Sequence, residues 1–320
     1  MKGNIRTKFL AAFVAASFGA GVGMATSLPN AAPGSAEMVI TAIPAKGATT
    51  PAALDRDDLT VMLASRPARV IGLQRLAGPL ANMQLFVLLD DSTPASTLGI
   101  QIPQLKAFIE ALPPGTQVAV GYMRNGTFGQ VQAFTTDHQM AAQAVRLPIA
   151  EVGVNGSPYF ALSDLAKHWP SKERAGETTT EAAGRRVVLM LTDGVDRYFN
   201  NSEVDDPYVD AAVHDALKNG IVVYSIYLRD AGIYDWSGRS ILFAQSRLEQ
   251  VSDETGGYAY SQELTNPVSI SPFLDNLQNR LDHQYRVTIE ALNVKGVQPV
   301  KVRSEAPGLK IEGPTRVYVP

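Results

Sequence analysis

The sequence predicts an α/β protein with a doubly wound, mostly parallel sheet flanked by helices, and with small β-rich flanks at both ends. Two observations predict this class. Nearly continuous apolar runs at residues 83–89, 187–191 and 221–227 are typical of strands buried on both faces. Segments with helical spacing of apolar residues separate these runs, and strands that alternate with helices form βαβ units with right-handed crossovers.

The first half of the chain contains the clearest turn signal. Apolar residues spaced for a helix occupy 104–112, and a Pro-Pro-Gly sequence ends that helix. A strand follows at 118–123, and Asn125-Gly126 predicts a tight hairpin into a second strand at 128–134. The other elements expected in this half are helices over 137–146 and 157–169 and an exposed, Thr-rich loop over 174–183.

The second half repeats the alternation of strands and helices. Val209, Val213 and Ala216 share one face of a predicted helix, which ends at an Asn-Gly pair. The other elements expected here are a helix over 240–255, a short strand over 258–260 and a last helix that begins at Ser271-Pro272.

Composition divides the chain into segments. Residues 28–52 are rich in Ala, Pro, Gly and Thr and have few large apolar residues, so we expect a linker there. Short apolar alternations predict β-strands on both sides of the central domain, and we expect these flanks to pair with each other. The predicted segments are 1–27, a signal peptide or signal anchor; 28–52, the linker; 53–82, the N-terminal β flank; 83–283, the α/β domain; and 284–320, the C-terminal β flank.

The N-terminus carries an export signal. Lys2, Arg6 and Lys8 precede an uncharged stretch that is close to the length needed to span a bilayer. The segment is therefore either a cleaved signal peptide or an uncleaved anchor, and only in the second case would the protein touch a membrane. In both cases we expect the body to be periplasmic, secreted or associated with the cell envelope.

Composition also excludes several functions. The formal charge of −3 and the absence of a basic stripe argue against a nucleic-acid partner. There are no cysteines, which excludes disulfides, thiolate zinc sites and thiol nucleophiles. The four histidines do not have metal-ligand spacing on one helix face, so a histidine-based zinc site is not expected.

Polar residues gather where two predicted strands end. Asp90-Asp91-Ser92 follows the first buried strand, and Asp193 follows the strand at 187–191. Ser157 opens the helix that lies between them in sequence. Ligands of open α/β sheets bind at the carboxyl edge, and Mg²⁺ prefers oxygen ligands from hydroxyls, carboxylates and water. These three loops therefore predict a candidate metal site.

At these residues the chain resembles a known family. The runs LFVLLDDS, NGSP and VVLMLTDG resemble the three metal-site loops of the von Willebrand factor A domain, and they occur in the family's order. Over about residues 54–292 the chain is similar to bacterial exported proteins related to von Willebrand factor A. The resemblance implies the Rossmann-like fold of that family and its metal-ion-dependent adhesion site.

The metal ligands that the resemblance implies are Asp90, Ser92, Ser157 and Asp193. The chain departs from the pattern at Pro94, where the family has a second serine and where proline offers no side-chain ligand. Substitutes for the missing hydroxyl are Thr93 and Ser96. Two interpretations stay open, a working metal site and a purely structural apex.

The function implied is that of an exported binding or adhesion protein that recognises a protein partner and is not an enzyme. Mg²⁺, or else Mn²⁺ or Ca²⁺, would keep one coordination position open for an acidic side chain of the partner. The alternatives are a metal-free scaffold of the cell envelope and a metal-dependent phosphoester hydrolase with Asp90 as nucleophile. The hydrolase needs a second carboxylate two residues further on, where Ser92 stands.

Aromatic side chains in loops at the same edge are candidates for partner binding. Exposed aromatics anchor many interfaces, although loop aromatics also pack on their own domain, which is the interpretation we favour. These candidates are Tyr198, Phe199, Tyr234 and Trp236. We expect the acidic residues that follow Asp193 to lie on the solvated surface: Asp196, Glu203, Asp205 and Asp206.

Overall fold

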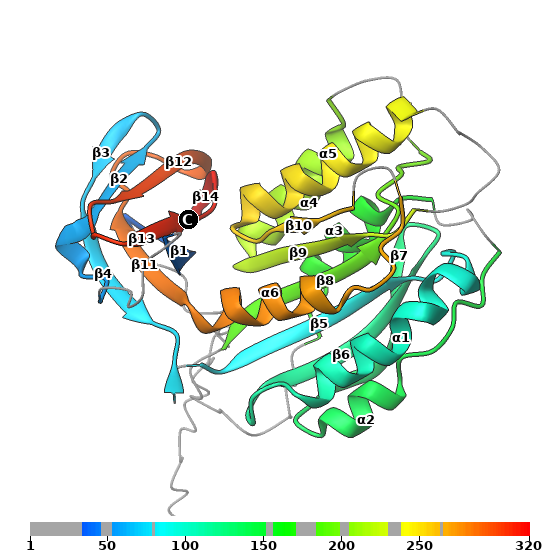
Figure 1. Cartoon of the computed structure of the whole chain (residues 1–320). Coiled ribbons are helices and arrows are strands. Elements are labelled where there is room, and N and C mark those ends of the chain that lie inside the picture. The colour runs from blue at the N-terminus through cyan, green and yellow to red at the C-terminus, as the bar shows by residue number, and fades with distance from the viewer. Residues whose placement is uncertain are drawn as a thin grey trace, which may run out of the picture.

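The protein has two lobes, a helix-covered sheet and a smaller β-sandwich beside it (Figure 1). The structure, a computed structural model, describes residues 34–45, 53–78, 81–151, 156–170, 184–198, 205–229, 238–262 and 265–320. The predicted signal segment 1–27 lies outside these residues. Within them, no helix has both the length and the apolar character needed to cross a bilayer.

The larger lobe is built on a six-stranded sheet with the order β10-β9-β8-β5-β6-β7. Its strands are β5 (Met83–Asp90), β6 (Gln117–Arg124), β7 (Thr127–Thr135), β8 (Arg185–Thr192), β9 (Ile221–Tyr227) and β10 (Ala259–Tyr260). All neighbours are parallel except β6 and β7, which form an antiparallel hairpin. The predicted doubly wound, mostly parallel sheet is thus confirmed.

Six helices cover this sheet on both faces. They are α1 (Ala95–Glu110), α2 (His138–Gln143), α3 (Pro158–Lys167), α4 (Pro207–Lys218), α5 (Gly238–Thr255) and α6 (Ser271–Asp282). One core contains buried residues of α1, α2 and α6, and the other contains buried residues of α3, α4 and α5. Along β5, Leu85 and Val87 belong to the first core and Phe86 and Leu88 to the second. Burial on both faces explains why the central strands are continuous apolar runs.

The hairpin between β6 and β7 forms where the sequence predicts it. Asn125 and Gly126 have φ angles of 51° and 73°, the left-handed conformation that a two-residue hairpin turn requires. Helix α1 differs from its prediction, because it begins at Ala95 rather than at residue 104. Pro103 lies inside it, where the ring removes one backbone donor without ending the helix.

The smaller lobe is a sandwich of two four-stranded sheets, with the orders β13-β1-β11-β4 and β14-β12-β2-β3. Its strands are β1 (Ser35–Pro44), β2 (Leu59–Leu63), β3 (Arg66–Ala68), β4 (Val70–Arg75), β11 (Gln284–Glu290), β12 (Gly296–Ser304), β13 (Leu309–Glu312) and β14 (Arg316–Val319). Strand β4 pairs with β11, and β2 pairs with β12, so the two β flanks do associate. Figure 1 shows this lobe at the end of the large sheet where the parallel strands begin.

The prediction of a linker over residues 28–52 is wrong for Ser35–Pro44, which form β1. This strand lies between β11 and β13, and Ala36, Ile40 and Ala42 are buried in the sandwich core. The Ala, Pro, Gly and Thr residues around it give the range 28–52 the composition of a linker, although Val39, Ile40 and Ile43 within it are strand-forming residues. Its burial comes from strands that lie more than 200 residues further along the chain.

Candidate functional site

The first loop of the predicted site follows β5 and is held by its own side chains. Asp90 and Ser92 are each 2% exposed. The backbone N–H and the hydroxyl of Ser92 both donate to Oδ1 of Asp90, at 3.0 and 2.7 Å. The structure therefore brings these two predicted ligands into direct contact.

The third loop follows β8 and is joined to the first loop. The Thr192 hydroxyl donates to Oδ2 of Asp90 at 3.0 Å, and this links the ends of the two neighbouring strands. Asp193 comes next and is 3% exposed. Its Oδ1 accepts the Val195 N–H at 3.0 Å, and its Oδ2 accepts the guanidinium of Arg197 at 2.8 Å. A positive side chain of the same loop thus neutralises the Asp193 carboxylate.

The second loop is tied to the third by residues outside the predicted ligand set. Ser157 is the N-cap of α3, because its Oγ accepts the Phe160 N–H at 3.3 Å. The same hydroxyl donates to Oδ2 of Asp196 at 2.7 Å, and the Arg197 N–H donates to the Gly156 carbonyl at 2.7 Å. Ser157 therefore reaches the loop that carries Asp193 through Asp196.

The expectation that the later acidic residues lie on the surface is wrong for two of them. Asp196 is fully buried, and Asp206 is 3% exposed. Asp206 caps α4 by accepting the Tyr208 N–H and lies 3.3 Å from Nε of Arg247. The Asp-Pro pair before α4 is the sequence signal that indicates such a cap. Asp205 is exposed, and Glu203 lies outside the described residues.

Asp91, next to the predicted ligand Asp90, is the most heavily paired carboxylate of this edge. Arg124 donates to its Oδ2 at 2.5 Å, Arg146 donates to its Oδ1 at 2.7 Å, and the Ile149 N–H donates at 3.1 Å. Burial raises the pKa of Asp91, but these hydrogen bonds and the two positive charges outweigh burial and hold the pKa below its ordinary value.

The two predicted substitute hydroxyls have different surroundings. Thr93 is 4% exposed, and its N–H donates to the Asp90 carbonyl at 3.3 Å. Ser96 is exposed in the first turn of α1. Pro94 is the N-cap of that helix, with φ −54°, and its carbonyl accepts the Thr97 and Leu98 N–H groups. The residue that departs from the family pattern thus starts α1.

The set of side chains fits a divalent metal poorly. Asp193 already holds a guanidinium, and a dication beside it would face the fixed charge of Arg197. Pro94 adds no ligand. Both predicted carboxylate ligands, Asp90 and Asp193, are thus at this edge of the sheet, but Asp193 forms an ion pair with Arg197.

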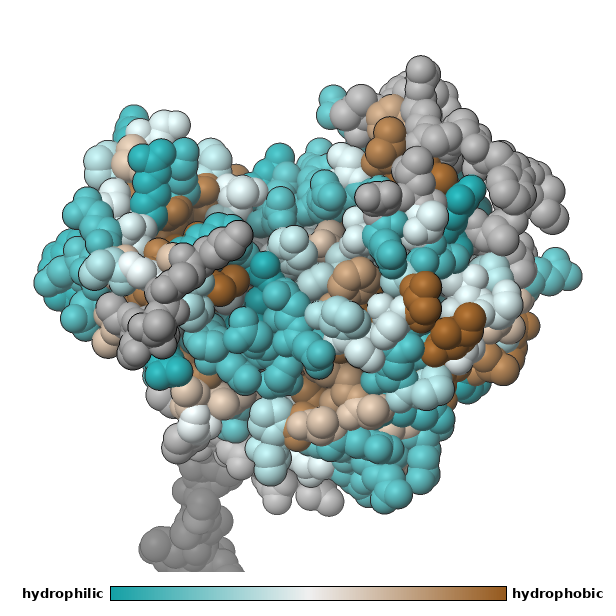
Figure 2. All heavy atoms as spheres, viewed as in Figure 1, coloured by the Kyte–Doolittle hydropathy of each residue, from teal (hydrophilic) through white to brown (hydrophobic). Residues whose placement is uncertain are grey.

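Exposed apolar side chains lie around this polar centre. Ile149, whose N–H binds Asp91, is 68% exposed, and Leu147 in the same loop is 49% exposed. Ile100 on α1 is 62% exposed. Figure 2 shows hydrophobic side chains grouped on the part of the surface over the carboxyl edge and the start of α1. We call Ile100, Leu147 and Ile149 the apolar rim.

Among the aromatic candidates, the structure describes only Tyr198. It is 55% exposed, and its ring makes an edge contact with Phe160 at 5.4 Å between centroids. Tyr198 also covers Gly156, where an added Cβ would lie 2.1 Å from the tyrosine ring. The residue therefore packs on its own domain with one face. Phe199, Tyr234 and Trp236 lie outside the described residues.

No family model matches this chain, and no curated protein matches it. A von Willebrand factor type A protein from Catenulispora acidiphila is similar in structure, with 11% identity, coverage of 91% of this chain and 74% of that chain, and a TM-score of 0.42. An aerotolerance-related membrane protein from Bacteroides fragilis has 12% identity, coverage of 62% and 98%, and a TM-score of 0.40. Proximal thread matrix protein 1 from the mussel byssus, with a zinc-occupied MIDAS motif, has 14% identity, coverage of 64% and 46%, and a TM-score of 0.39. Because these scores are low, the fold class rests on the chain's own strand order.

Proposed function

We propose that this chain is a von Willebrand factor A-like binding protein that recognises a protein partner at the carboxyl edge of its six-stranded sheet, without a catalytic step. The observation that carries the proposal is the apolar rim around a polar centre whose charges are already paired. Exposed apolar groups beside paired charges are typical of interfaces, because covering the apolar groups is favourable and paired charges cost less to desolvate than unpaired ones.

The paired carboxylates also support binding over catalysis. A nucleophilic or basic Asp90 would need an oxygen directed at a substrate, whereas both of its oxygens accept hydroxyl protons from Ser92 and Thr192. Asp193 is bound to Arg197. The hydrolase alternative has no observation in its favour, and a phosphoester turnover assay tests it directly.

We propose further that recognition at this edge does not require a metal. Arg197 supplies beside Asp193 the positive charge that a metal ion supplies in the family the chain resembles. An acidic side chain of the partner would then meet an arginine-bearing surface formed by Arg197, Arg124 and Arg146, the last two being 48% and 34% exposed in their side chains. Exposed arginines of this kind bind carboxylates by paired hydrogen bonds.

Titration calorimetry with Mg²⁺, Mn²⁺ and Ca²⁺ tests the proposal that recognition at this edge does not require a metal. We expect no heat of metal binding for the wild-type protein, because Arg197 already forms an ion pair with the Asp193 carboxylate. Arg197→Gln is expected to gain saturable binding of at least one ion, and Arg197→Gln with Asp193→Ala is expected to lose it again. Saturable metal binding by the wild-type protein that Asp193→Ala abolishes would contradict metal-independent recognition and support a metal-dependent site.

Partner capture tests the recognition surface. Ile149→Asp is expected to reduce the amount of partner retained by the immobilised protein at least tenfold, because a charge replaces the most exposed member of the apolar rim. Val131→Asp is the matched control, since Val131 is 48% exposed on β7 and lies outside the rim. Capture is expected to persist in a chelator. Equal losses for both variants would sink the proposed surface.

We also propose that the protein is exported, on the strength of Lys2, Arg6, Lys8 and the uncharged stretch after them. Mass measurement of the protein recovered from the cell envelope and from the medium tests this. A mature form shortened by close to 27 residues is expected for a cleaved signal, and a full-length form in the membrane fraction is expected for an anchor. Recovery of the full-length chain from the cytoplasm alone would refute export.

A further inference from the structure

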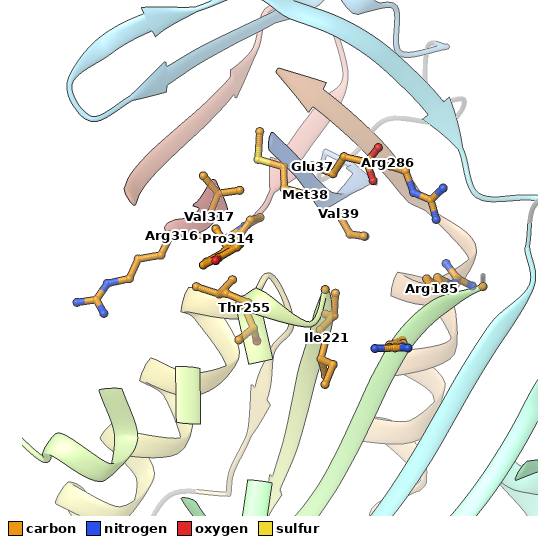
Figure 3. Close-up of a pocket in the computed structure, with 16 residues that line it drawn as sticks. Glu37, Met38, Val39, Arg185, Ile221, Thr255, Arg286, Pro314, Arg316 and Val317 are labelled. Carbon is orange, nitrogen blue, oxygen red and sulfur yellow. The ribbon is translucent and has the colours of Figure 1, made fainter. Parts of the chain in front are cut away.

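A hollow lies between the two lobes, at the end of the sheet opposite to the carboxyl edge. Its walls come from the starts of β8 and β9 in the larger lobe and from β1, β11 and β14 in the sandwich (Figure 3). Its volume is about 110 Å³, and it opens to solvent. This space is large enough for a small ligand group, since one water needs only about 10–15 Å³ by such a measure.

The hollow is lined by a buried arginine that forms no ion pair among the described residues. Arg185, the first residue of β8, is 7% exposed. Its Nη1 donates to two neutral oxygens, the Leu281 carbonyl at 2.7 Å and Oε1 of Gln284 at 2.6 Å. Its Nε is buried and has no hydrogen-bond acceptor. Burial lowers the pKa of Arg185 to about 10. A buried cation with an unused donor is costly unless an anion accompanies it.

A second arginine lies near the first at the same side of the hollow. Arg286 of β11 and Arg185 of β8 lie on the same side of it with their guanidinium groups directed toward each other (Figure 3). Burial and then the positive charge of Arg286 lower the pKa of Arg185, while the neighbouring Tyr224 and Asp282 raise it in part. Among the described residues, neither arginine forms an ion pair with a carboxylate. Two like charges at one hollow create a site for an anion.

Arg186 also lines the hollow, but its charge lies on the other face of the sheet. Its Nε is buried without a hydrogen-bond acceptor, its Nη1 makes a long bond of 3.4 Å to the Asn219 carbonyl, and its guanidinium lies over the Trp169 ring at 5.4 Å. Arg316, which also lines the hollow, is engaged elsewhere, because it pairs with Asp210 and Glu254 at 3.2 and 3.3 Å. Its guanidinium points away from the hollow in Figure 3.

One carboxylate opposes these charges. Glu37 of β1 lines the hollow, and burial raises its pKa, while the charge of Arg286 lowers it in part. Glu37 therefore neutralises Arg286 incompletely. The lining retains a surplus of positive charge in a chain whose formal net charge is −3.

Apolar side chains of both lobes complete the lining. Val39 of β1 and Ile221 of β9 point toward each other across it (Figure 3). A ligand for this place needs a negatively charged head and a short apolar body. Planar guanidinium groups match the oxygen spacing of carboxylates and phosphates.

We propose that this hollow, which we call the interlobe site, binds a small amphipathic oxyanion, with the head between Arg185 and Arg286 and the apolar body against Val39 and Ile221. The ligand would touch both lobes at once. Its occupation would therefore hold the sandwich against the sheet domain. The site is independent of the carboxyl edge and of any metal there.

Titration calorimetry at constant ionic strength tests the proposal with phenyl phosphate, hexanoate and inorganic phosphate as probes. We expect saturable 1:1 binding of phenyl phosphate or hexanoate, and binding of inorganic phosphate at least tenfold weaker, because it lacks the apolar body. The stronger of the two organic probes identifies the head group. Phenol and hexanol are the neutral controls and are expected not to bind.

Three substitutions locate the binding. Arg286→Gln is expected to weaken it at least tenfold, and Arg303→Gln, at an exposed arginine of β12, is expected to leave it unchanged. Glu37→Gln is expected to tighten it about threefold to tenfold, a gain that misfolding cannot imitate. Absence of saturable binding by both organic probes, or binding that responds to neither Arg286→Gln nor Glu37→Gln, would overturn the interlobe site.

Discussion

Three arginines neutralise the carboxylates at the carboxyl edge. Arg124 and Arg146 bind Asp91, and Arg197 binds Asp193. The sequence places Arg197 only four residues after Asp193, so this pair has a local signal that sequence reasoning missed. The pairs of Asp91 join residues 33 and 55 positions apart, and no spacing rule connects them. Single side chains therefore decide whether this edge carries a metal or an internal cation.

Asp91→Asn tests this charge network at the level of stability. The variant leaves Arg124 and Arg146 beside a neutral amide that offers one acceptor oxygen instead of two. We expect a loss of about 1–3 kcal/mol in the free energy of unfolding, the range for removing a partner of buried, charge-assisted hydrogen bonds. Asp57→Asn, on an exposed carboxylate, is expected to change stability by less than about 0.5 kcal/mol. Urea unfolding at pH 7 measures both.

The same network predicts a dependence on pH. The pKa of Asp91 in the folded protein lies below its ordinary value, so the ionised form stabilises the fold. This contribution is complete above the pKa of an unfolded aspartate, about 3.9, and is lost as the pH falls through the folded value. The stability difference between wild type and Asp91→Asn is therefore expected to be constant from pH 7 to pH 5 and to shrink below pH 4. A difference that grows on acidification would contradict the network.

Among the elements, the β6–β7 hairpin shows how a local signal fixes geometry. Gly126 has a φ of 73°, and an added Cβ would lie 3.1 Å from Phe160 and 3.2 Å from Tyr198. The turn thus needs glycine for its backbone and also for the packing of α3 and the third loop against it. Strand β1 is the opposite case, because the composition of residues 28–52 hides its strand-forming Val39, Ile40 and Ile43, and its partner strands supply its burial.

Gly126→Ala is expected to destabilise the protein by about 1–2 kcal/mol, the cost of a left-handed conformation for a residue with a Cβ. Gly129→Ala is the matched control, since Gly129 lies in the same hairpin, has no positive φ, and an added Cβ there meets only the Tyr122 carbonyl at 3.8 Å. Thermal unfolding of both variants measures the difference. Equal effects at both positions would show that the turn conformation does not matter.

For the whole molecule, the main feature is that the smaller lobe is built from both ends of the described chain. The sandwich takes β1 to β4 from before the large sheet and β11 to β14 from after it. Strand β11 follows α6 directly, and Arg185 of β8 donates to Gln284 at its start. The two lobes therefore close on each other only when both ends of the chain are present.

A chain that ends at His283 tests this dependence. It keeps all six strands of the large sheet but removes β11 to β14, which are the partners of β1, β2 and β4. We expect a sharp loss of soluble protein, because the apolar faces of β1 and β2 become exposed. Soluble yield and size-exclusion chromatography measure it. A monodisperse truncated chain with an unchanged unfolding temperature would show that the lobes are independent.

The sequence by itself determined the α/β class, the parallel sheet, the hairpin and the three loops that carry the candidate site. These features depend on periodicity and turn chemistry, which act between residues close in the chain. The tertiary structure alone decided that Ser35–Pro44 form a strand, that Asp196 and Asp206 are buried, and that Arg185 and Arg286 meet at one hollow. The physical reason is that burial and charge pairing depend on which segments meet in space, and here those segments lie far apart along the chain.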